Sequence, residues 1–333
     1  MKKKKFNVGI IGCGLIGKKR AKALVSNGSL IACSDLDVSR AQYLSKDTDA
    51  KVLSWRDLVS SKEIDIVIIA TNHNSLAEIA RAAASNGKHI LIEKPGAKNV
   101  LEIESIESIA KKNSVKIHVG FNHRFHRSLL KAREIIDSGE IGELMFIRGR
   151  YGHGGRIGYE KEWRANPDLS GGGELIDQGT HLIDLTRWFL GDISDVQGLA
   201  CNFFWDMKVE DNAFMTLKTS KNKVAFLHVS CTEWKNLFSF EIYGKLGKLD
   251  LSGLGGSYGQ EKITLYKMLP EMGPPKTISW EYPMADNSWE LEINDFFQNI
   301  RLNKDPTTSL ADAHAVLSTI ESIYKSSGYD FNT

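Results

Sequence analysis

The sequence has little that would tie the protein to a membrane, to nucleic acid or to an oxidising compartment. It contains no run of about 20 apolar residues and therefore predicts no membrane-spanning helix. The formal net charge of the 333 residues is only +2, which argues against nucleic acid or an acidic membrane surface as a partner. The 4 cysteines include no CxxC pair and no zinc-like spacing. We therefore expect reduced thiols, no metal centre and a cytoplasmic protein.

The N-terminus allows two interpretations. Lysines at positions 2–5 and the apolar stretch 6–13 resemble the start of a secretory signal, and Ile10-Ile11-Gly12-Cys13 resembles a lipoprotein cleavage site. The apolar stretch is short, is interrupted by glycines and is followed at once by Lys18-Lys19-Arg20. The same residues make a better first strand of a nucleotide-binding unit, which is the interpretation we favour.

The first part of the chain alternates apolar runs with helical segments. Ile64–Ala70 is nearly all apolar and β-branched, as in strands that are covered on both faces. The alternation predicts a doubly wound parallel sheet, a Rossmann domain, over residues 1–123. The expected strands are Phe6–Ile11, Leu30–Ser34, Ile64–Ala70, His89–Ile92 and Val115–Val119, and the expected helices are Lys18–Ser26, Leu76–Ser85 and Val100–Lys112.

The rest of the chain, residues 124–333, has a different pattern. Short strands separated by turns run from 195 to 283 and fit an antiparallel or mixed sheet. We expect an α+β domain with a large, mainly antiparallel open sheet, whose last helix can pack back on the first domain. Its expected helices are Ser128–Ser138, Glu174–Leu190, Trp289–Leu302 and Ser309–Lys325, and its first strand is Leu144–Arg150. Glycine clusters stand at 152–158 and at Gly171-Gly172-Gly173.

A dinucleotide site is predicted at the first strand–helix turn. Gly12-Cys13-Gly14-Leu15-Ile16-Gly17 has GxGxxG spacing, which lets backbone N–H groups and a helix N-terminus face a pyrophosphate. Asp35 ends the second strand, where a carboxylate binds the ribose hydroxyls and repels a 2′-phosphate. NAD is therefore favoured, although the nearby Arg40 leaves NADP open. Thr71 and Asn72 follow a buried strand and are candidate cofactor contacts or plain helix-capping residues.

Two segments carry candidate chemical groups. Glu93-Lys94-Pro95 puts a lysine at a strand end, beside a proline whose peptide bond can be cis, although the lysine can equally be an ordinary surface residue. Asp177, His181 and Asp184 have helical spacing, which predicts that they share one face. A carboxylate one turn from a histidine can orient an imidazole that exchanges a hydroxyl proton during hydride transfer. An amphipathic helix with a histidine on its polar edge would show the same pattern.

Over essentially its whole length the chain resembles the Gfo/Idh/MocA oxidoreductases. The segments that carry the resemblance are the glycine turn, Asp35, Glu93-Lys94-Pro95, Gly120-Phe121-Asn122-His123-Arg124-Phe125, Trp163-Arg164 and the run from Gly171 to Asp177 and His181. It implies an NAD(P)-dependent oxidoreductase that acts on a ring hydroxyl of a sugar, polyol or sugar nucleotide. One segment departs from the family pattern, because Asn72 replaces a proline and Leu76 a histidine.

The resemblance also implies roles for individual residues. Lys94 would lie beside the nicotinamide and the reacting hydroxyl, and His181 would exchange the proton with Asp177 as its partner. Glu93 joins Lys94 among the expected cofactor contacts. The expected substrate contacts are Asn122, Arg124, Tyr151, Trp163, Arg164, Asp177 and His181. An NAD-dependent glycoside hydrolase and a non-catalytic regulator are the alternatives.

The resemblance further implies a homodimer or homotetramer formed by the second domain. Family members commonly pair through the helix-free face of that sheet. The aromatic residues proposed for this face, which could equally belong to the core, are Phe203, Trp205, Phe226 and Phe238.

Overall fold

The computed structural model describes residues 5–24, 27–46 and 48–329. The chain divides into two compact units, residues 1–122 with 289–314 and residues 123–288 with 315–333. Residues 289–314 therefore group with the first unit, whereas the sequence analysis assigned them to the second domain. The main boundary at 123/124 stays a proposal. The expected helix end at Ser26 and the lysines at 2–4 lie outside the described residues.

The first unit contains a parallel sheet of six strands in the order β3-β2-β1-β4-β5-β6. The predicted doubly wound parallel sheet is thus confirmed. Its strands are β1 Phe6–Ile11, β2 Gly28–Ser34, β3 Lys51–Val52, β4 Ile66–Ile69, β5 His89–Glu93 and β6 Ile117–Gly120. Its helices are α1 Leu15–Ala23, α2 Val38–Ser45, α3 Trp55–Ser60, α4 His73–Ser85, α5 Val100–Lys112 and α9 Ser288–Arg301.

Apolar packing explains why α9 belongs to this unit. Ile293, Phe296 and Phe297 of α9 lie in the same buried cluster as Val8 and Ile10 of β1. Strand β4 is buried along its whole length, as its uninterrupted apolar sequence predicts. Helices α2 and α3 were not predicted.

The second unit contains an eight-stranded sheet in the order β14-β13-β12-β11-β7-β10-β9-β8. All neighbours are antiparallel except β7 and β10, so the mainly antiparallel sheet is confirmed. The strands are β7 Leu144–Gly152, β8 Ile193–Cys201, β9 Asn212–Thr219, β10 Val224–Ser230, β11 Leu237–Gly244, β12 Gly247–Ser252, β13 Glu261–Lys267 and β14 Lys276–Tyr282.

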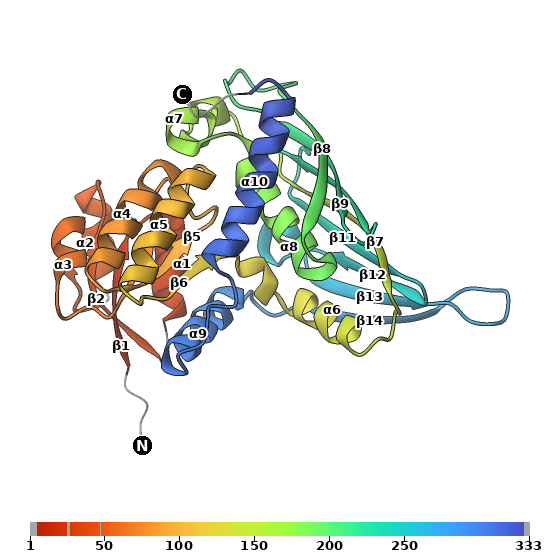
Figure 1. Ribbon diagram of the computed structural model, residues 1–333, viewed down its shortest axis with the longest axis horizontal. Helices are drawn as coiled ribbons and strands as arrows, with labels where there is room; N and C mark the ends of the chain where they lie inside the picture. Colours follow the sequence, from red (N-terminus) through yellow and green to blue (C-terminus); the bar gives the residue numbers. More distant parts are fainter. Residues whose placement is uncertain (1–4, 25–26, 47, 330–333) are drawn as a thin grey trace. The chain divides into compact units, whose positions relative to one another are not determined.

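Helices cover one face of this second sheet. Figure 1 shows α6 (Arg127–Asp137) and α8 (Thr180–Leu190) on that face, and in the part of the chain that is described the other face carries no helix. Helix α10 (Leu310–Ser326) begins in the first unit and ends in the second. The short helical segments are η1 Asn122–Phe125, η2 Tyr159–Lys161, η3 Trp163–Ala165, α7 Pro167–Ser170, η4 Leu175–Gly179 and η5 Gly256–Tyr258.

Two details of the second unit differ from expectation. The uniform helix expected over Glu174–Leu190 is wrong in its first turn, because η4 is a wider π-helical turn that precedes α8. Phe203 and Trp205 were placed in strands but lie in the loop after β8. Of the aromatic residues proposed for the open face, Phe238 is core and only 2% exposed, whereas Phe226 is 55% exposed.

Candidate active site

In the first unit the glycine turn has the shape that a pyrophosphate needs. Gly12 has φ +93°, and a Cβ there would lie 2.3 Å from the carbonyl oxygen of Ala70. A Cβ on Gly17 would lie 1.9 Å from the carbonyl oxygen of Gly12, so both positions require glycine. At Gly14 a Cβ would meet nothing within 4 Å. The turn therefore leaves open space at the start of α1, where N–H groups attract an anion.

Asp35 lies beside this turn, just after β2. Its Oδ2 accepts the Cys13 N–H at 2.7 Å, and its Oδ1 accepts the Asp37 N–H at 2.9 Å. A carboxylate offers about four acceptor positions, so these two bonds leave capacity for ribose hydroxyls. The Cys13 thiol is buried and donates to the Ser34 carbonyl, and its contact with Cys33 and its burial raise its pKa. Cys13 therefore contributes its backbone to the turn rather than a reactive thiolate.

Thr71 and Asn72 follow β4 and lie at the same edge of the sheet as the glycine turn. The Thr71 amide nitrogen is one of the atoms that a side chain at Gly12 would strike. Asn72 is the residue before α4, and its carbonyl accepts the hydroxyls of Thr71 and Ser75. The carboxyl ends of β1, β2 and β4 thus bring Gly12, Asp35 and Thr71 together. NAD fits this arrangement in its donors, its acceptor and its open space.

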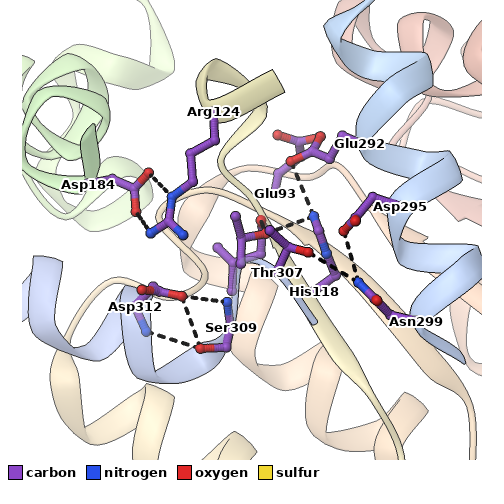
Figure 2. A network of polar contacts seen from close by, with 12 residues as sticks. Glu93, His118, Arg124, Asp184, Glu292, Asp295, Asn299, Thr307, Ser309 and Asp312 are labelled. Carbon is purple, nitrogen blue, oxygen red and sulfur yellow. Dashed lines mark hydrogen bonds and ion pairs between the residues drawn. The ribbon is translucent and has the colours of Figure 1, made fainter. Parts of the chain in front are cut away.

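Lys94 follows β5, and the Lys94–Pro95 peptide bond is cis, as the sequence allowed. The preceding Glu93 is buried, and its carboxylate accepts Arg20 Nε at 2.5 Å. Arg20 also forms an ion pair with Glu292 of α9. Glu292 lies 3.4 Å from His118 Nε2, and Figure 2 shows the two side chains pointing toward each other. We call Arg20, Glu93 and Glu292 the buried triad.

The triad shares one cation between two carboxylates. Burial raises the pKa of Glu93, which Arg20 only partly offsets. Burial also opposes ionisation of Glu292, but Arg20 and His118 hold the pKa of that carboxyl below its usual value. Glu93 is therefore held by the protein itself, and any contact between its side chain and a cofactor stays a prediction.

In the second unit a polar cluster surrounds His181. The His181 ring stacks on His123, with 3.7 Å between ring centroids and 23° between planes. Tyr151, at the end of β7, lies 6.0 Å from His181 by ring centroids. Burial raises the pKa of Tyr151 well above its usual value, so the phenol stays a hydrogen-bond donor. His181 is itself buried, at 4% exposure, on the first turn of α8.

Asp177 lies on the π turn and forms an ion pair with Arg164, Nε to Oδ2 at 2.8 Å. The carboxylate raises the pKa of Arg164 and keeps the guanidinium charged. The Arg164 guanidinium also lies over the Trp163 ring, 4.5 Å from its centroid. These three predicted residues therefore form one contiguous group.

Glu174 is a member of the cluster that the sequence analysis missed. It is 1% exposed, and its Oε1 accepts the Tyr159 hydroxyl at 2.7 Å and lies 3.3 Å from His153 Nε2. Although burial opposes it, the Glu174 carboxylate raises the pKa of His153. Burial raises the pKa of Tyr258, next to Tyr151, to about 12. Glu174 could have been noticed, because it follows the triple glycine and precedes Asp177 by three residues.

Asp184, expected to share a face with His181, has a structural partner instead. Arg124 donates to it through Nε at 2.8 Å and Nη2 at 2.5 Å, a two-pronged ion pair visible in Figure 2. Both side chains are buried. Asn122, the first residue of η1, is also buried, at 5% exposure. Arg124 therefore fixes α8 to the segment that carries His123.

Two further findings concern the described residues as a set. No group of three His, Cys, Asp or Glu side chains among them could hold a metal ion. None of the helices in the described ranges is both long and apolar enough to cross a membrane.

Family models match both parts of the chain. The model described as "Oxidoreductase family, NAD-binding Rossmann fold" matches residues 6–121, and the model of the GFO/IDH/MocA C-terminal domain matches residues 129–250. Levoglucosan dehydrogenase of Pseudarthrobacter phenanthrenivorans is 29% identical over 58% of this chain and 53% of that protein. Inositol 2-dehydrogenase of Salmonella typhimurium is 23% identical over 90% of this chain and 88% of that protein.

Solved structures share the fold. Levoglucosan dehydrogenase in complex with NADH and levoglucosan superposes with a TM-score of 0.89 at 23% identity, covering 98% of each chain. GenD2 from gentamicin A biosynthesis, in complex with NAD, superposes with a TM-score of 0.84 at 21% identity, covering 98% of this chain and 95% of that one.

Proposed function

Because the chain belongs to the GFO/IDH/MocA oxidoreductase family, with an NAD-binding Rossmann fold at its N-terminus, we propose that it is an NAD-dependent sugar or polyol dehydrogenase. It would move a hydride between NAD and a ring carbinol of a sugar, polyol or sugar nucleotide. The observation that carries this proposal is the buried pair of His181 and Asp177, four residues apart on consecutive helical turns, with Arg164 ion-paired to Asp177. The names of the relatives, levoglucosan and inositol dehydrogenases, agree with this substrate class.

The residues of the first unit fit NAD in a definite way. The Gly12–Gly17 turn would hold the pyrophosphate, and Asp35 would accept the ribose hydroxyls. Thr71, Asn72 and the Glu93–Lys94 segment would complete the contacts. When bound, NAD supplies a hydride acceptor at its nicotinamide ring.

Residues of the second unit would accept the proton of the substrate hydroxyl and stabilise the charge that results. A ring nitrogen of His181 takes that proton as the carbinol is oxidised, and the stacked His123 fixes the plane of the imidazole. Asp177 would give the imidazolium an opposite charge, and the ion pair with Arg164 holds the Asp177 carboxylate in place. Lys94 would stabilise the developing alkoxide with its ammonium group.

Substrate hydroxyls would contact Asn122, Tyr151, Trp163 and Arg164. Arg124 is better assigned as a positioning residue, because Asp184 occupies its guanidinium.

We further propose that the protein works in the cytosol as a homodimer or homotetramer. The four cysteines are free thiols, as in proteins of reducing compartments. The open sheet face would form the subunit interface, with Phe226 near its centre.

The test is a screen of the purified protein with NAD or NADP against polyols, aldoses, uronic acids and sugar nucleotides, following formation of reduced nicotinamide. We expect net NADH with one substrate class and a loss of kcat of at least about 100-fold in His181→Ala and Lys94→Ala. His314→Ala and Lys98→Ala, which alter a half-exposed histidine and a lysine just beyond the Lys94 loop, serve as matched controls and should keep full activity.

Release of free sugar from a glycoside without net NADH would replace the proposal with a hydrolase. Tight NAD binding with no turnover of any substrate would replace it with a regulator.

A further inference from the structure

A cleft in the second unit lies outside the site described above. Its volume is about 420 Å³, within the roughly 300–1,000 Å³ of small-molecule sites. We call it the aromatic cleft; its lining residues are Gly154, Arg156, Ile157, Gly158, Glu160, Phe204, Trp205 and Trp234. We propose that the aromatic cleft binds a neutral pyranose ring, the second ring of a glycoside whose first ring is the one oxidised. This proposal rests on the proposed dehydrogenase function.

The aromatic walls are held in place although they face solvent. The fully buried Asp211 carboxylate accepts the backbone N–H groups of Phe203, Phe204 and Trp205 at 2.7–3.1 Å. Trp205 Nε1 donates to the Cys231 carbonyl at 3.0 Å. The buried Asp211 carboxylate thus fixes the backbone of the loop, although the Phe204 side chain of that loop remains 57% exposed. Such preorganisation of exposed apolar surface is typical of a binding site.

Trp234 supplies a second, independent observation. It is 66% exposed, and its φ of +55° lies in the left-handed region that a large side chain avoids. Its ring meets Phe204 edge to face, with 4.8 Å between centroids and 87° between planes. A strained backbone that displays an exposed tryptophan contributes little to the core, and such strain concentrates at ligand sites.

The glycine cluster at 152–158 is built around these rings. A Cβ on Gly155 would lie 2.4 Å from the Trp205 ring, and a Cβ on Gly154 would lie 2.8 Å from the Trp234 backbone. Both positions therefore need glycine so that the loop can close one side of the cleft. The cleft therefore explains two of the glycines of this segment, Gly154 and Gly155.

The charged side chains that line the cleft favour a neutral ligand over an anionic one. Among the described residues that line the cleft, Arg156 is the only cation, and Glu162 already pairs with it at 2.8 Å. Glu160 adds a carboxylate that would repel a phosphate but accept sugar hydroxyls. The flat aromatic faces can stack on the C–H face of a pyranose. A neutral sugar therefore fits better than the nucleoside diphosphate of a sugar nucleotide.

Contacts within the unit link the cleft to the catalytic cluster. The Trp205 ring lies 5.5 Å from the Tyr159 ring by centroids, and the Tyr159 hydroxyl donates to Glu174, three residues before Asp177. Trp205 of the cleft and Glu174 of the catalytic cluster therefore share Tyr159 as a common neighbour. This proximity is what a substrate of two linked rings would need.

The test is direct binding to the full-length protein, which does not depend on turnover. Calorimetric titrations would use glucose, cellobiose, maltose and lactose, with uridine and UMP as competing probes. We expect one disaccharide to bind more tightly than glucose, and Trp234→Ala and Phe204→Ala to raise its Kd by about tenfold. Trp55→Ala, an aromatic change in the first unit, is the control and should leave the Kd unchanged.

A second variant separates function from folding. Trp234→Gly relieves the positive φ, so we expect it to lose disaccharide affinity while keeping or raising Tm. A lower Tm with unchanged affinity would overturn the proposal. It would also be overturned if no disaccharide binds better than glucose, if uridine or UMP displaces the disaccharide, or if Trp234→Ala dissociates an oligomer.

Failure of the proposed dehydrogenase function would appear elsewhere, as absent NADH formation with disaccharide binding intact.

Discussion

Glu210 is a fully buried carboxylate at the start of the helical segment that carries Asp177 and His181. It accepts the N–H groups of Gly173 and Leu175 at 2.9–3.1 Å and the Tyr324 hydroxyl at 2.8 Å. Burial raises its pKa from 4.5 to about 7 despite these bonds. A single proton near neutral pH therefore changes the charge at the start of the helical segment that carries the candidate residues Asp177 and His181.

The raised pKa of Glu210 makes the free energy of unfolding depend on pH. Between pH 4.5 and about 7 the folded protein holds a proton on Glu210 that the unfolded chain has released. The free energy of unfolding contributed by Glu210 is therefore complete below pH 4.5 and is lost as the pH rises to about 7. We expect Tm to fall across this range in the wild type and to fall less in Glu210→Gln.

Thermal unfolding at closely spaced pH values checks this expectation. His153 also has a raised pKa, so it contributes a loss of stability in the same direction in both proteins. The difference between wild type and Glu210→Gln isolates the carboxylate. Parallel Tm curves for the two proteins would show that Glu210 is ionised throughout.

At the scale of elements, the buried triad joins α1, β5 and α9. Arg20 is 0% exposed, and its two carboxylate partners come from segments far apart in the sequence. Removal of the cation leaves two carboxylates buried together, which is more costly than the absence of the whole group. The triad also fixes the residue before Lys94.

Arg20→Met should therefore lower the free energy of unfolding by about 3–5 kcal/mol. The triple variant Arg20→Met, Glu93→Gln, Glu292→Gln should recover much of that loss, because no charge is then left unpaired. Urea unfolding followed by circular dichroism measures both values. An equally large loss in the triple variant would mean that packing of the arginine stem, rather than its charge, stabilises the unit.

Some helices and strands could be predicted from the sequence and others could not. The parallel strands were predictable because β4 and its neighbours are uninterrupted apolar runs between turn residues, and α5 was predicted with its observed bounds. The π turn at Leu175–Gly179 was not, since apolar periodicity does not distinguish it from the α-helix that follows. The partners Arg124 for Asp184 and Arg164 for Asp177 come from loops whose course only tertiary structure determines.

At the scale of the whole molecule, the helix-free face of the second sheet is the surface that we propose as the subunit interface. Phe226 lies between Thr216 of β9 and Arg148 of β7 in the strand register, and Arg148 pairs with Glu241 of β11. His228 of β10 stacks on Phe214, its partner in β9, with 4.3 Å between ring centroids. The face thus mixes exposed aromatic rings with paired charges, as subunit interfaces do.

Phe226→Glu should convert the oligomer proposed above into monomers, because it would bury two unpaired carboxylates across a symmetric interface. Light scattering after size-exclusion chromatography gives the mass of each species. Met272→Glu, on the fully exposed β13–β14 loop, is the matched control and should leave the mass unchanged. A monomeric wild type, or an unchanged mass in Phe226→Glu, would exclude this face as the interface.

The discontinuous first unit has a consequence for biosynthesis. Residues 1–122 are synthesised long before residues 289–314, which complete the same unit. Until then Arg20 and Glu93 lack Glu292, and the apolar cluster lacks Phe296 and Phe297. The first unit therefore cannot form its complete set of buried contacts until the whole second sheet has been synthesised. A chain cut before residue 289 would therefore leave the apolar cluster open to solvent and Arg20 without one of its two carboxylates.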